Sequence, residues 1–393
     1  MSKILFLYEP VGSGHQVAAE SLALACQSLL PGVTTQILDP FGEIWSGIPA
    51  LMTGINTLTL LLAPHVHDEV WQGSDQMNWI EKLIDLKPLK EAFLKLMLNL
   101  APDLVVTTHD MPCSFLAELR QAGDWPVPLV SVITDFAAHP YWPTSGVDRY
   151  LVAAAEVREQ LAERGMEPNR VYVTGIPISA SFSKPRNQAR ARRELELLDI
   201  PTVLIIAGGL RMGPYVTSQL LLDQIVQELD RVSGTFQVIV VTGSNTALKK
   251  YIEGRVRRLT RPVQVTGFVQ NMPDYMAAAD LLISKPGGLV SSEALASGLP
   301  MVSFKAGPGQ ERANQEYLLA QGAAEAAGEA PEVAEVVAKL IRDPARLGQM
   351  RRRAQAMGRP YSAADGARLI ANMLYARETK GRALLTYRPG VLL

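Results

Sequence analysis

Cysteine is scarce in this 393-residue sequence, which holds only Cys26 and Cys113. Neither residue belongs to a CxxC pair or a Cys/His cluster, so the sequence predicts no zinc site. Two separate thiols fit a reducing compartment and need no disulfide. An excess of charge is also lacking, with 38 basic against 39 acidic residues. Because nucleic-acid-binding domains usually show a basic excess, this balance argues against that class of protein.

Long hydrophobic runs are lacking as well. The N-terminal run Ile4–Tyr8 is shorter than the apolar core of a signal peptide. No segment reaches the ~18 uncharged apolar residues that a spanning helix needs. The longest candidate, Leu51–Ala63, is interrupted by Thr, Gly and Asn. We therefore expect a protein that can lie on a membrane without crossing it.

Short apolar runs, several of them rich in Val and Ile, alternate with helical stretches along the chain. Such runs suit parallel strands that are buried on both faces, with helices between them. The alternation predicts an α/β protein with two doubly wound halves. The predicted strands are Ile4–Leu7, Thr35–Leu38, Leu104–Thr107, Leu129–Thr134, Arg149–Val152, Val171–Val173, Val203–Ala207, Gln237–Thr242, Val263–Val265, Leu281–Ser284 and Met301–Ser303.

The length also favours two domains, since one domain usually has ~100–200 residues. A polar, basic stretch, Ser179–Glu196, separates the two series of strands, so we predict a hinge near residues 178–200. The predicted domains are 1–178 and 179–357. Residues 358–393 have a helical pattern without a partner strand, and we expect this tail to pack back onto the first domain.

The first chemical motif is Gly12–His15, between a predicted strand and the predicted helix Gln16–Leu29. Glycines such as Gly14 let the backbone turn tightly and approach a ligand. His15 would lie at the carboxyl edge of the sheet, where open α/β sheets bind ligands. There it can act as a general base, or it can simply cap the helix; the sequence leaves both open.

The second motif, Ser284–Glu293, contains the glycine pair Gly287 and Gly288 between a strand and a helix. Backbone N–H groups at such a helix start can bind a diphosphate. Glu293 can then accept hydrogen bonds from two ribose hydroxyls, as the acidic residue of dinucleotide folds does. The alternative for Glu293 is a capping or helix-dipole partner.

Four further segments contribute candidate ligand contacts. In the loop before a predicted helix, the side chains of Gln310, Glu311 and Asn314 suit sugar hydroxyls, unless Glu311 and its neighbours are solvent-facing residues of a capped loop. The strand end at residues 207–211 and two later strand ends face the same edge. The candidates there are Gly208, Gly209, Arg211, Asn245 and Phe268, with a helix cap as the favoured alternative for Asn245.

Asp135 follows a predicted strand in the first half, with His139 and Trp142 shortly after it. This carboxylate can orient His15 or bind an acceptor hydroxyl. It can equally cap a turn, and the sequence does not decide between these roles.

Some features fit a membrane surface. An apolar stripe at helical spacing, Trp79–Ile84, lies in a region rich in lysine, and such a helix can lie in a bilayer interface. Two basic clusters, 249–261 and 346–353, can contact anionic headgroups. The alternatives are an ordinary core helix and solvated helix faces.

Taken in order, these motifs resemble the diacylglycerol glycosyltransferases, that is, the monogalactosyldiacylglycerol synthases and the processive diacylglycerol glucosyltransferases. A more distant likeness is to the N-acetylglucosaminyltransferase of lipid I. The likeness runs from about Ile4 to Ala324. The segments that carry it are Gly12–His15, Thr134–Phe136 with Asp148–Tyr150, Gly175–Pro177, Lys285–Ala294 and Pro308–Asn314.

The resemblance implies a GT-B fold, with two Rossmann-like domains facing each other across a cleft. It implies transfer of galactose or glucose from a UDP-sugar to diacylglycerol with inversion, on the cytoplasmic face of an anionic membrane, without a metal or cofactor. It assigns His15 as the base, Glu293 to the ribose, and Gln310 and Glu311 to the sugar. Two alternatives stay open: a UDP-sugar 2-epimerase, and a lipid- or nucleotide-binding module without turnover.

Overall fold

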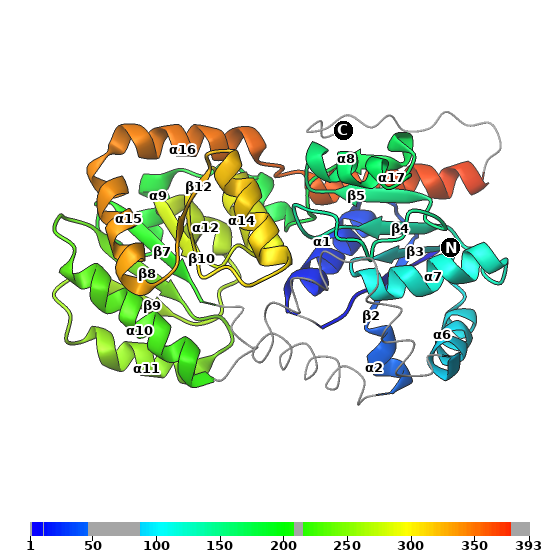
Figure 1. Ribbon diagram of the computed structural model, residues 1–393, viewed down its shortest axis with the longest axis horizontal. Coiled ribbons are helices and arrows are strands. Elements are labelled where there is room, and N and C mark those ends of the chain that lie inside the picture. The colour runs from blue at the N-terminus through cyan, green and yellow to red at the C-terminus, as the bar shows by residue number, and fades with distance from the viewer. Residues whose placement is uncertain (1, 11, 46–86, 208–214, 379–393) are drawn as a thin grey trace. The chain divides into compact units, whose positions relative to one another are not determined.

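The computed structural model describes residues 2–10, 12–45, 87–207 and 215–378 (Figure 1). These residues form two compact units. Unit 1 contains the described residues up to Ala180 and from Tyr361 onward, with Pro308–Gln310. Unit 2 contains Ser181–Gly307 and Glu311–Pro360.

Unit 1 is built around a parallel sheet in the order β2-β1-β3-β4-β5-β6. Its central strands are buried on both faces, because nearly all their side chains are apolar and helices cover them. The strands are β1 (Lys3–Leu7), β2 (Thr34–Leu38), β3 (Leu104–Thr107), β4 (Leu129–Val132), β5 (Arg149–Val152) and β6 (Val171–Val173). The helices are α1 (Gly14–Leu29), α2 (Pro40–Ile44), α6 (Lys87–Leu100), α7 (Asp110–Ala122), α8 (Ala155–Glu163) and α17 (Ser362–Glu378), with a short 3-10 turn at Pro168–Arg170. A second 3-10 turn, Ala180–Ser183, spans the boundary between the two units.

Unit 2 repeats this plan with a parallel sheet in the order β12-β11-β10-β7-β8-β9. Its strands are β7 (Thr202–Ile206), β8 (Gln237–Val241), β9 (Val263–Thr266), β10 (Leu281–Ser284), β11 (Met301–Phe304) and β12 (Ala324–Ala327). Its helices are α9 (Gln188–Glu194), α10 (Tyr215–Arg231), α11 (Thr246–Val256), α12 (Met272–Ala278), α13 (Gly288–Ala296), α14 (Gln310–Ala320), α15 (Ala330–Arg342) and α16 (Pro344–Met357). The prediction of two doubly wound parallel halves is thereby confirmed.

The strand order brings distant parts of the chain together at one edge. In each parallel sheet, the loops after the strands lie at the carboxyl edge. In unit 1, β1 pairs with β3, and β3 pairs with β4, so the loops after residues 7, 107 and 132 are neighbours. In unit 2, β10 lies between β7 and β11 in the same way.

The C-terminal helix α17 packs along α1 in unit 1. Its Ala367, Ile370 and Ala371 are fully buried in the same apolar cluster as residues of β1 and α1. The small residue at Gly366 permits this close approach, because an added Cβ would lie only 3.0 Å from side-chain carbons of Leu22 and Leu151. At the start of the helix, Ser362 accepts a hydrogen bond from the N–H of Ile178.

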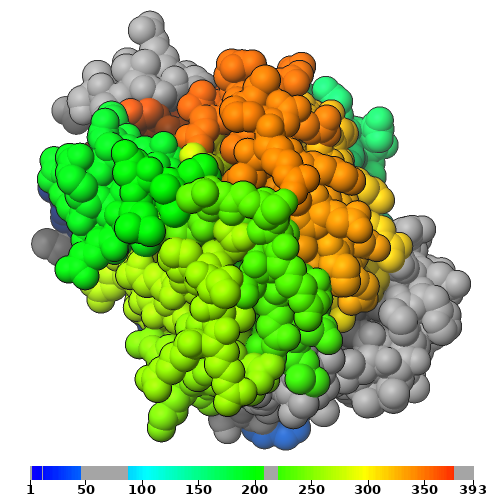
Figure 2. Space-filling model, turned by 90° about the vertical axis from the view of Figure 1, so that its left-hand side faces the viewer, coloured from blue at the N-terminus to red at the C-terminus, as the bar shows by residue number. Residues whose placement is uncertain are grey.

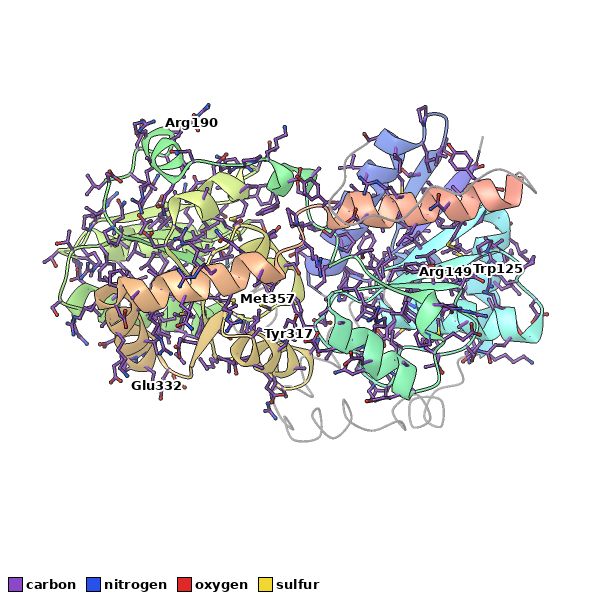
Figure 3. All side chains as sticks on the ribbon, turned by 90° about the horizontal axis from the view of Figure 1, so that it is seen from above. Trp125, Arg149, Arg190, Tyr317, Glu332 and Met357 are labelled. Atoms are coloured by element: carbon purple, nitrogen blue, oxygen red, sulfur yellow. The ribbon has the colours of Figure 1, made fainter. Side chains whose placement is uncertain are left out.

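The polar stretch between the two sheets is not uniformly a linker, because it contains α9. Arg192 turns toward the sheet and is only 9% exposed; it donates to the carbonyl of Ala278 and pairs with Asp280 at 2.7 Å. Arg190 instead projects away from the unit and pairs with Glu194 (Figure 3). Residues 188–194 are therefore fastened to unit 2.

Candidate functional site

His15 lies at the carboxyl edge of the unit 1 sheet, in the first turn of α1. The preceding loop turns through Gly12, whose φ of +79° favours glycine. The helix begins at Gly14, and the residue before it, Ser13, makes no side-chain cap. The ring of His15 hydrogen-bonds to Thr108 and Thr134, which lie outside α1, and not to the N–H groups of its own helix. The capping alternative for His15 is therefore wrong.

The hydrogen bonds of His15 fix its tautomer. Its Nδ1 lies 2.7 Å from the backbone carbonyl oxygen of Thr108, and 3.0 Å from the hydroxyl of Thr134. A carbonyl oxygen can only accept, so Nδ1 carries the hydrogen and donates it. The lone pair is then on Nε2, which is the nitrogen that can take a proton from a substrate.

The surroundings of His15 also keep the ring neutral. The pKa of His15 is lowered to about 3, mainly by burial and to a smaller extent by the nearby charge of His109. The imidazole is therefore in its base form throughout the neutral range. This is the protonation state that a general base needs before reaction.

Sequence reasoning missed three residues beside His15: Glu9, His109 and Asp110. The His109 ring packs edge-on against the His15 ring, with centroids 4.7 Å apart. Nδ1 of His109 lies 2.8 Å from Asp110 and 3.2 Å from Glu9, which is only 5% exposed. A signal was present, because His109 and Asp110 lie just beyond a predicted strand, as His15 lies beyond β1.

Asp135 lies in the segment after β4 and is partly buried. The contacts at Nδ1 of His15 come from Thr108 and from Thr134, the residue before Asp135. Asp135 acts on the cluster through its charge, which raises the pKa of His109. Its role toward an acceptor hydroxyl stays a prediction.

In unit 2, the N-terminus of α13 lies at the carboxyl end of β10. Gly287 is the N-cap residue and provides no side-chain cap, and Gly288 opens the helix. The first N–H groups of a helix have no acceptor within it, and they carry a partial positive charge. The start of α13 therefore offers the N–H groups that a diphosphate could bind, and the role predicted for this glycine pair stays a prediction.

Glu293 lies in the second turn of α13, and the first turn holds no acidic residue. The capping alternative for Glu293 is therefore wrong. Burial raises the pKa of its carboxyl group to about 8. An acid buried in this way needs a compensating partner when it ionises, and the two hydroxyls of a ribose can provide one.

This buried acid has a consequence for stability. Between its ordinary pKa of 4.5 and about 8, Glu293 keeps its proton in the folded protein, whereas the unfolded chain releases it. The unfolded state then binds fewer protons, so the stability of the wild-type protein falls as pH rises through this window. Glu293→Gln lacks the titration. The melting temperature of the variant minus that of the wild type should therefore increase from about pH 5 to pH 8. A thermal-shift series in which this difference does not change with pH would contradict the assignment.

The loop at the start of α14 holds its acidic residue in place. Glu311 accepts a hydrogen bond of 2.7 Å from the N–H of Gly307, and its carboxylate pairs with Lys285 at 3.2 Å. In this respect the alternative of a capped loop holds for Glu311. Gln310 is partly buried at the first position of α14, whereas Asn314 is fully buried, so it is not a solvent-facing residue.

The remaining candidates differ in what the structure shows. Asn245 caps α11 by accepting from the N–H of Leu248, as its alternative predicted. The side chain of Phe268 is 73% exposed after β9, so an aromatic face is open to a ligand there. Gly208, Gly209 and Arg211 lie outside the described residues.

The predicted membrane features are only partly described. The stripe Trp79–Ile84 lies outside the described residues. The basic clusters lie on and next to α11 and α16, which Figure 2 shows on the surface of unit 2 in yellow-green and orange. Within the described ranges, no helix is both long and apolar enough to span a bilayer. The same ranges contain no group of three His, Cys, Asp or Glu residues placed to hold a metal.

Comparison with known proteins adds two family matches. The family described as monogalactosyldiacylglycerol (MGDG) synthase matches residues 71–178, and the family described as glycosyl transferases group 1 matches residues 201–343. A curated relative is the processive diacylglycerol beta-glucosyltransferase of Bacillus licheniformis. It is 28% identical over 351 residues, which cover 89% of each chain.

Solved structures of the same fold are more distant in sequence. The crystal structure of MurG from Acinetobacter baumannii aligns with a TM-score of 0.60 at 14% identity, covering 94% of this chain and 99% of MurG. The UDP-GlcNAc 2-epimerase from Neisseria meningitidis, bound to UDP-GlcNAc, also gives 0.60 at 14% identity, covering 95% and 100% of the two chains. These likenesses confirm the two-domain GT-B fold and by themselves do not choose between transferase and epimerase.

Proposed function

We propose that this chain, which belongs to the diacylglycerol glycosyltransferase family, transfers glucose or galactose from a UDP-sugar to diacylglycerol with inversion at the anomeric carbon. The observation that carries the proposal is the tautomer of His15. A carbonyl oxygen fixes the hydrogen on Nδ1 and leaves Nε2 as a proton acceptor at a ligand-binding sheet edge. Relatives that match most of the chain act on the same lipid, according to their names.

The proposed reaction begins with binding of the two substrates. Diacylglycerol binds unit 1, with its free hydroxyl beside Nε2 of His15. The UDP-sugar binds unit 2, with its diphosphate on the N–H groups at the start of α13 and its ribose on Glu293. Phe268 and the start of α14 are assigned to the base and the sugar.

The hydroxyl oxygen then attacks the anomeric carbon from the side opposite the diphosphate. A bond forms between this oxygen and the carbon, and the bond from carbon to the β-phosphate oxygen breaks. The hydroxyl proton moves to Nε2 of His15, and the electron pair leaves with UDP. Because attack and departure occur on opposite faces, the configuration of the anomeric carbon inverts.

Charge develops at two places in this step. His15 becomes positive, and the leaving diphosphate gains negative charge. The negative charge that develops on the diphosphate stabilises the positive charge on His15. During the transfer, His15 is therefore a stronger base than its pKa in the free protein implies. The preorganised N–H groups of α13 stabilise the diphosphate, which is the role that a metal plays in other transferases.

This assignment predicts that a metal is not required. Transfer rates should be the same with and without excess EDTA, because the N-terminus of α13 supplies the positive charge around the diphosphate. A rate that falls with EDTA and recovers with Mg²⁺ or Mn²⁺ would contradict this part of the mechanism.

We also propose that the protein works at the cytoplasmic face of an anionic membrane. On α6, Leu98 is 57% exposed, although Phe93 and Met97 of the same helix are buried. A helix with one buried face and an exposed apolar residue can touch a bilayer interface. The basic clusters of α11 and α16 are the proposed contacts with anionic headgroups.

The test of the proposed function is a panel of nucleotide sugars. The purified protein is incubated with UDP-glucose, UDP-galactose or UDP-N-acetylglucosamine, with and without vesicles that contain diacylglycerol. The lipid products are then identified by mass spectrometry. The expected result is a hexosyl lipid, formed only with vesicles and with one or both UDP-hexoses. Conversion of UDP-N-acetylglucosamine to its 2-epimer in plain buffer would favour the epimerase, and UDP binding without any product would favour a binding module.

A further inference from the structure

The second imidazole beside His15 belongs to His109, and the proposed mechanism does not use it. His109 is the N-cap residue of α7 and follows β3, the strand that pairs with β1. The two histidine rings meet edge to face, with an interplanar angle of 71° and centroids 4.7 Å apart. They therefore come from neighbouring strand ends although 94 positions separate them in sequence.

Two carboxylates hold a proton on His109. Its Nδ1 lies 2.8 Å from Oδ1 of Asp110 and 3.2 Å from Oε2 of Glu9. The N–H of Met111 also points at this nitrogen, but at 3.4 Å it is the weaker contact. With two acceptors this close, Nδ1 carries hydrogen, and the two carboxylates favour a second proton and a positive charge on the ring. Burial alone would lower the pKa of His109, but the two carboxylates raise it to about 9.

Thr108 links the two histidines, because it is hydrogen-bonded to His15 and covalently joined to His109. Its carbonyl oxygen accepts from Nδ1 of His15, and its hydroxyl donates to the backbone carbonyl of His15 at 2.9 Å. His109 is the next residue in the chain. The orientation of the His15 ring and the position of the His109 charge are therefore set by one short piece of backbone.

We propose that His109 is a positioning residue for His15: its positive charge, held by Glu9 and Asp110, adds to the effect of burial and keeps a second proton off the His15 imidazole. A second proton on His15 would place two positive charges on rings in contact. The charge of His109 thus opposes protonation of His15 by solvent before the acceptor arrives. This inference deepens the proposed function, since the value of a neutral His15 rests on its role as the base.

Other charged groups face this pair and must be weighed against His109. Among charges that act on His15, that of His109 is the largest; Asp110 acts in the opposite direction, and His139 contributes least. Burial lowers the pKa of His139 to about 4, so it is neutral at neutral pH. The negative charge of Asp135 raises the pKa of His109. Burial raises the pKa of Glu9 to about 7, and the charge of Asp39 acts in the same direction. Above that pH, both carboxylates beside His109 are ionised.

The experiment uses the full chain labelled with ¹⁵N-histidine and follows the ring nitrogens by NMR across a pH series, without substrates. In the wild-type protein, His15 should show a protonated Nδ1 and a bare Nε2 down to about pH 5. His109→Asn keeps a good N-cap residue for α7 but removes the charge. We expect the titration midpoint of His15 to rise by at least about one pH unit in this variant. An unchanged midpoint would overturn the inference.

Two more variants keep the test decisive. Glu9→Gln removes one carboxylate and should lower the titration midpoint of His109, which tests how the charge on His109 is held even if His109→Asn fails to fold. His139→Asn is the matched control, because among the charges that act on His15 that of His139 contributes least, and it should move the His15 midpoint much less than His109→Asn does. A shift of equal size in this control would show a general loss of packing and refute the specific role of His109.

Activity supplies a separate readout. In His109→Asn, the acid limb of the kcat/KM profile should move to higher pH by the same amount as the NMR midpoint of His15. Since the NMR series needs no turnover, the two claims can fail independently. A shifted midpoint in a protein without any transferase activity would sustain the role of His109 and refute the proposed function.

Discussion

Replacing His15 by alanine lowers kcat by about 10²–10⁴-fold, because this is the usual contribution of a positioned general base. The KM for the UDP-sugar should change little, since the diphosphate and the ribose are assigned to α13 of unit 2. The measurement is the rate of hexosyl-lipid formation in vesicles that contain diacylglycerol, at saturating UDP-sugar.

The control for this prediction must separate chemistry from folding. Alanine leaves the carbonyl of Thr108 without its partner, which costs about 1–3 kcal/mol of stability for a buried group. His15→Gln is the matched variant, because its amide can still donate to that carbonyl but cannot act as a base. Both variants should lose turnover, whereas only His15→Ala should have a lower melting temperature than the wild type. Near-normal turnover in a folded His15→Ala protein would remove this residue from the base role.

Replacing Gly287 by alanine raises the KM for the UDP-sugar by about 10–100-fold with little loss of stability. In the free protein an added Cβ would meet only Val290, at an ordinary contact distance of 3.7 Å, and φ is −68°. The cost to folding is therefore the small penalty of alanine at an N-cap, about 1 kcal/mol or less. The methyl group would instead stand where the diphosphate approaches the backbone, and a lost hydrogen bond to a charged group costs about 1.5–3 kcal/mol.

Two other glycines provide matched controls for this variant. Gly254 lies in α11 with no heavy atom within 4 Å of an added Cβ, so Gly254→Ala should leave donor binding unchanged. At Gly358 an added Cβ would lie 2.5 Å from the carbonyl oxygen of Leu295, so alanine there should destabilise unit 2. Calorimetric titration with UDP distinguishes the three. Normal UDP affinity in Gly287→Ala would mean that the diphosphate binds elsewhere.

Most of the fold could be predicted because its strands are buried on both faces. Runs such as Leu104–Thr107 and Leu281–Ser284 were located to the residue, since short and mostly apolar runs that alternate with helical stretches suit the centre of a parallel sheet. The edge strand β12 was missed. Its sequence, Ala-Glu-Ala-Ala, has no β-branched residue, and it becomes a strand because β11 pairs with it and α15 packs on it.

The site was predictable where one short segment carries all of the signal. Gly12–His15 and Gly287–Gly288 each lie between a strand and a helix, and each was found at such a junction. The ion pair of Glu9 with His109 was not found, because these residues meet only through the pairing of β1 with β3. Likewise, the carboxylate of Glu311 is taken up by Gly307 and Lys285, and only the folded loop reveals this.

The central claim is that Nε2 of His15 accepts the hydroxyl proton of diacylglycerol during transfer of a hexose. The most direct measurement compares the wild-type protein with His15→Gln in one set of vesicles, with UDP binding followed in parallel. We predict that the wild-type protein forms a β-linked hexosyl lipid, and that the variant binds UDP equally well but forms almost none. Equal lipid formation by both proteins would contradict the account, as would UDP-sugar consumption by the wild type without any new glycolipid.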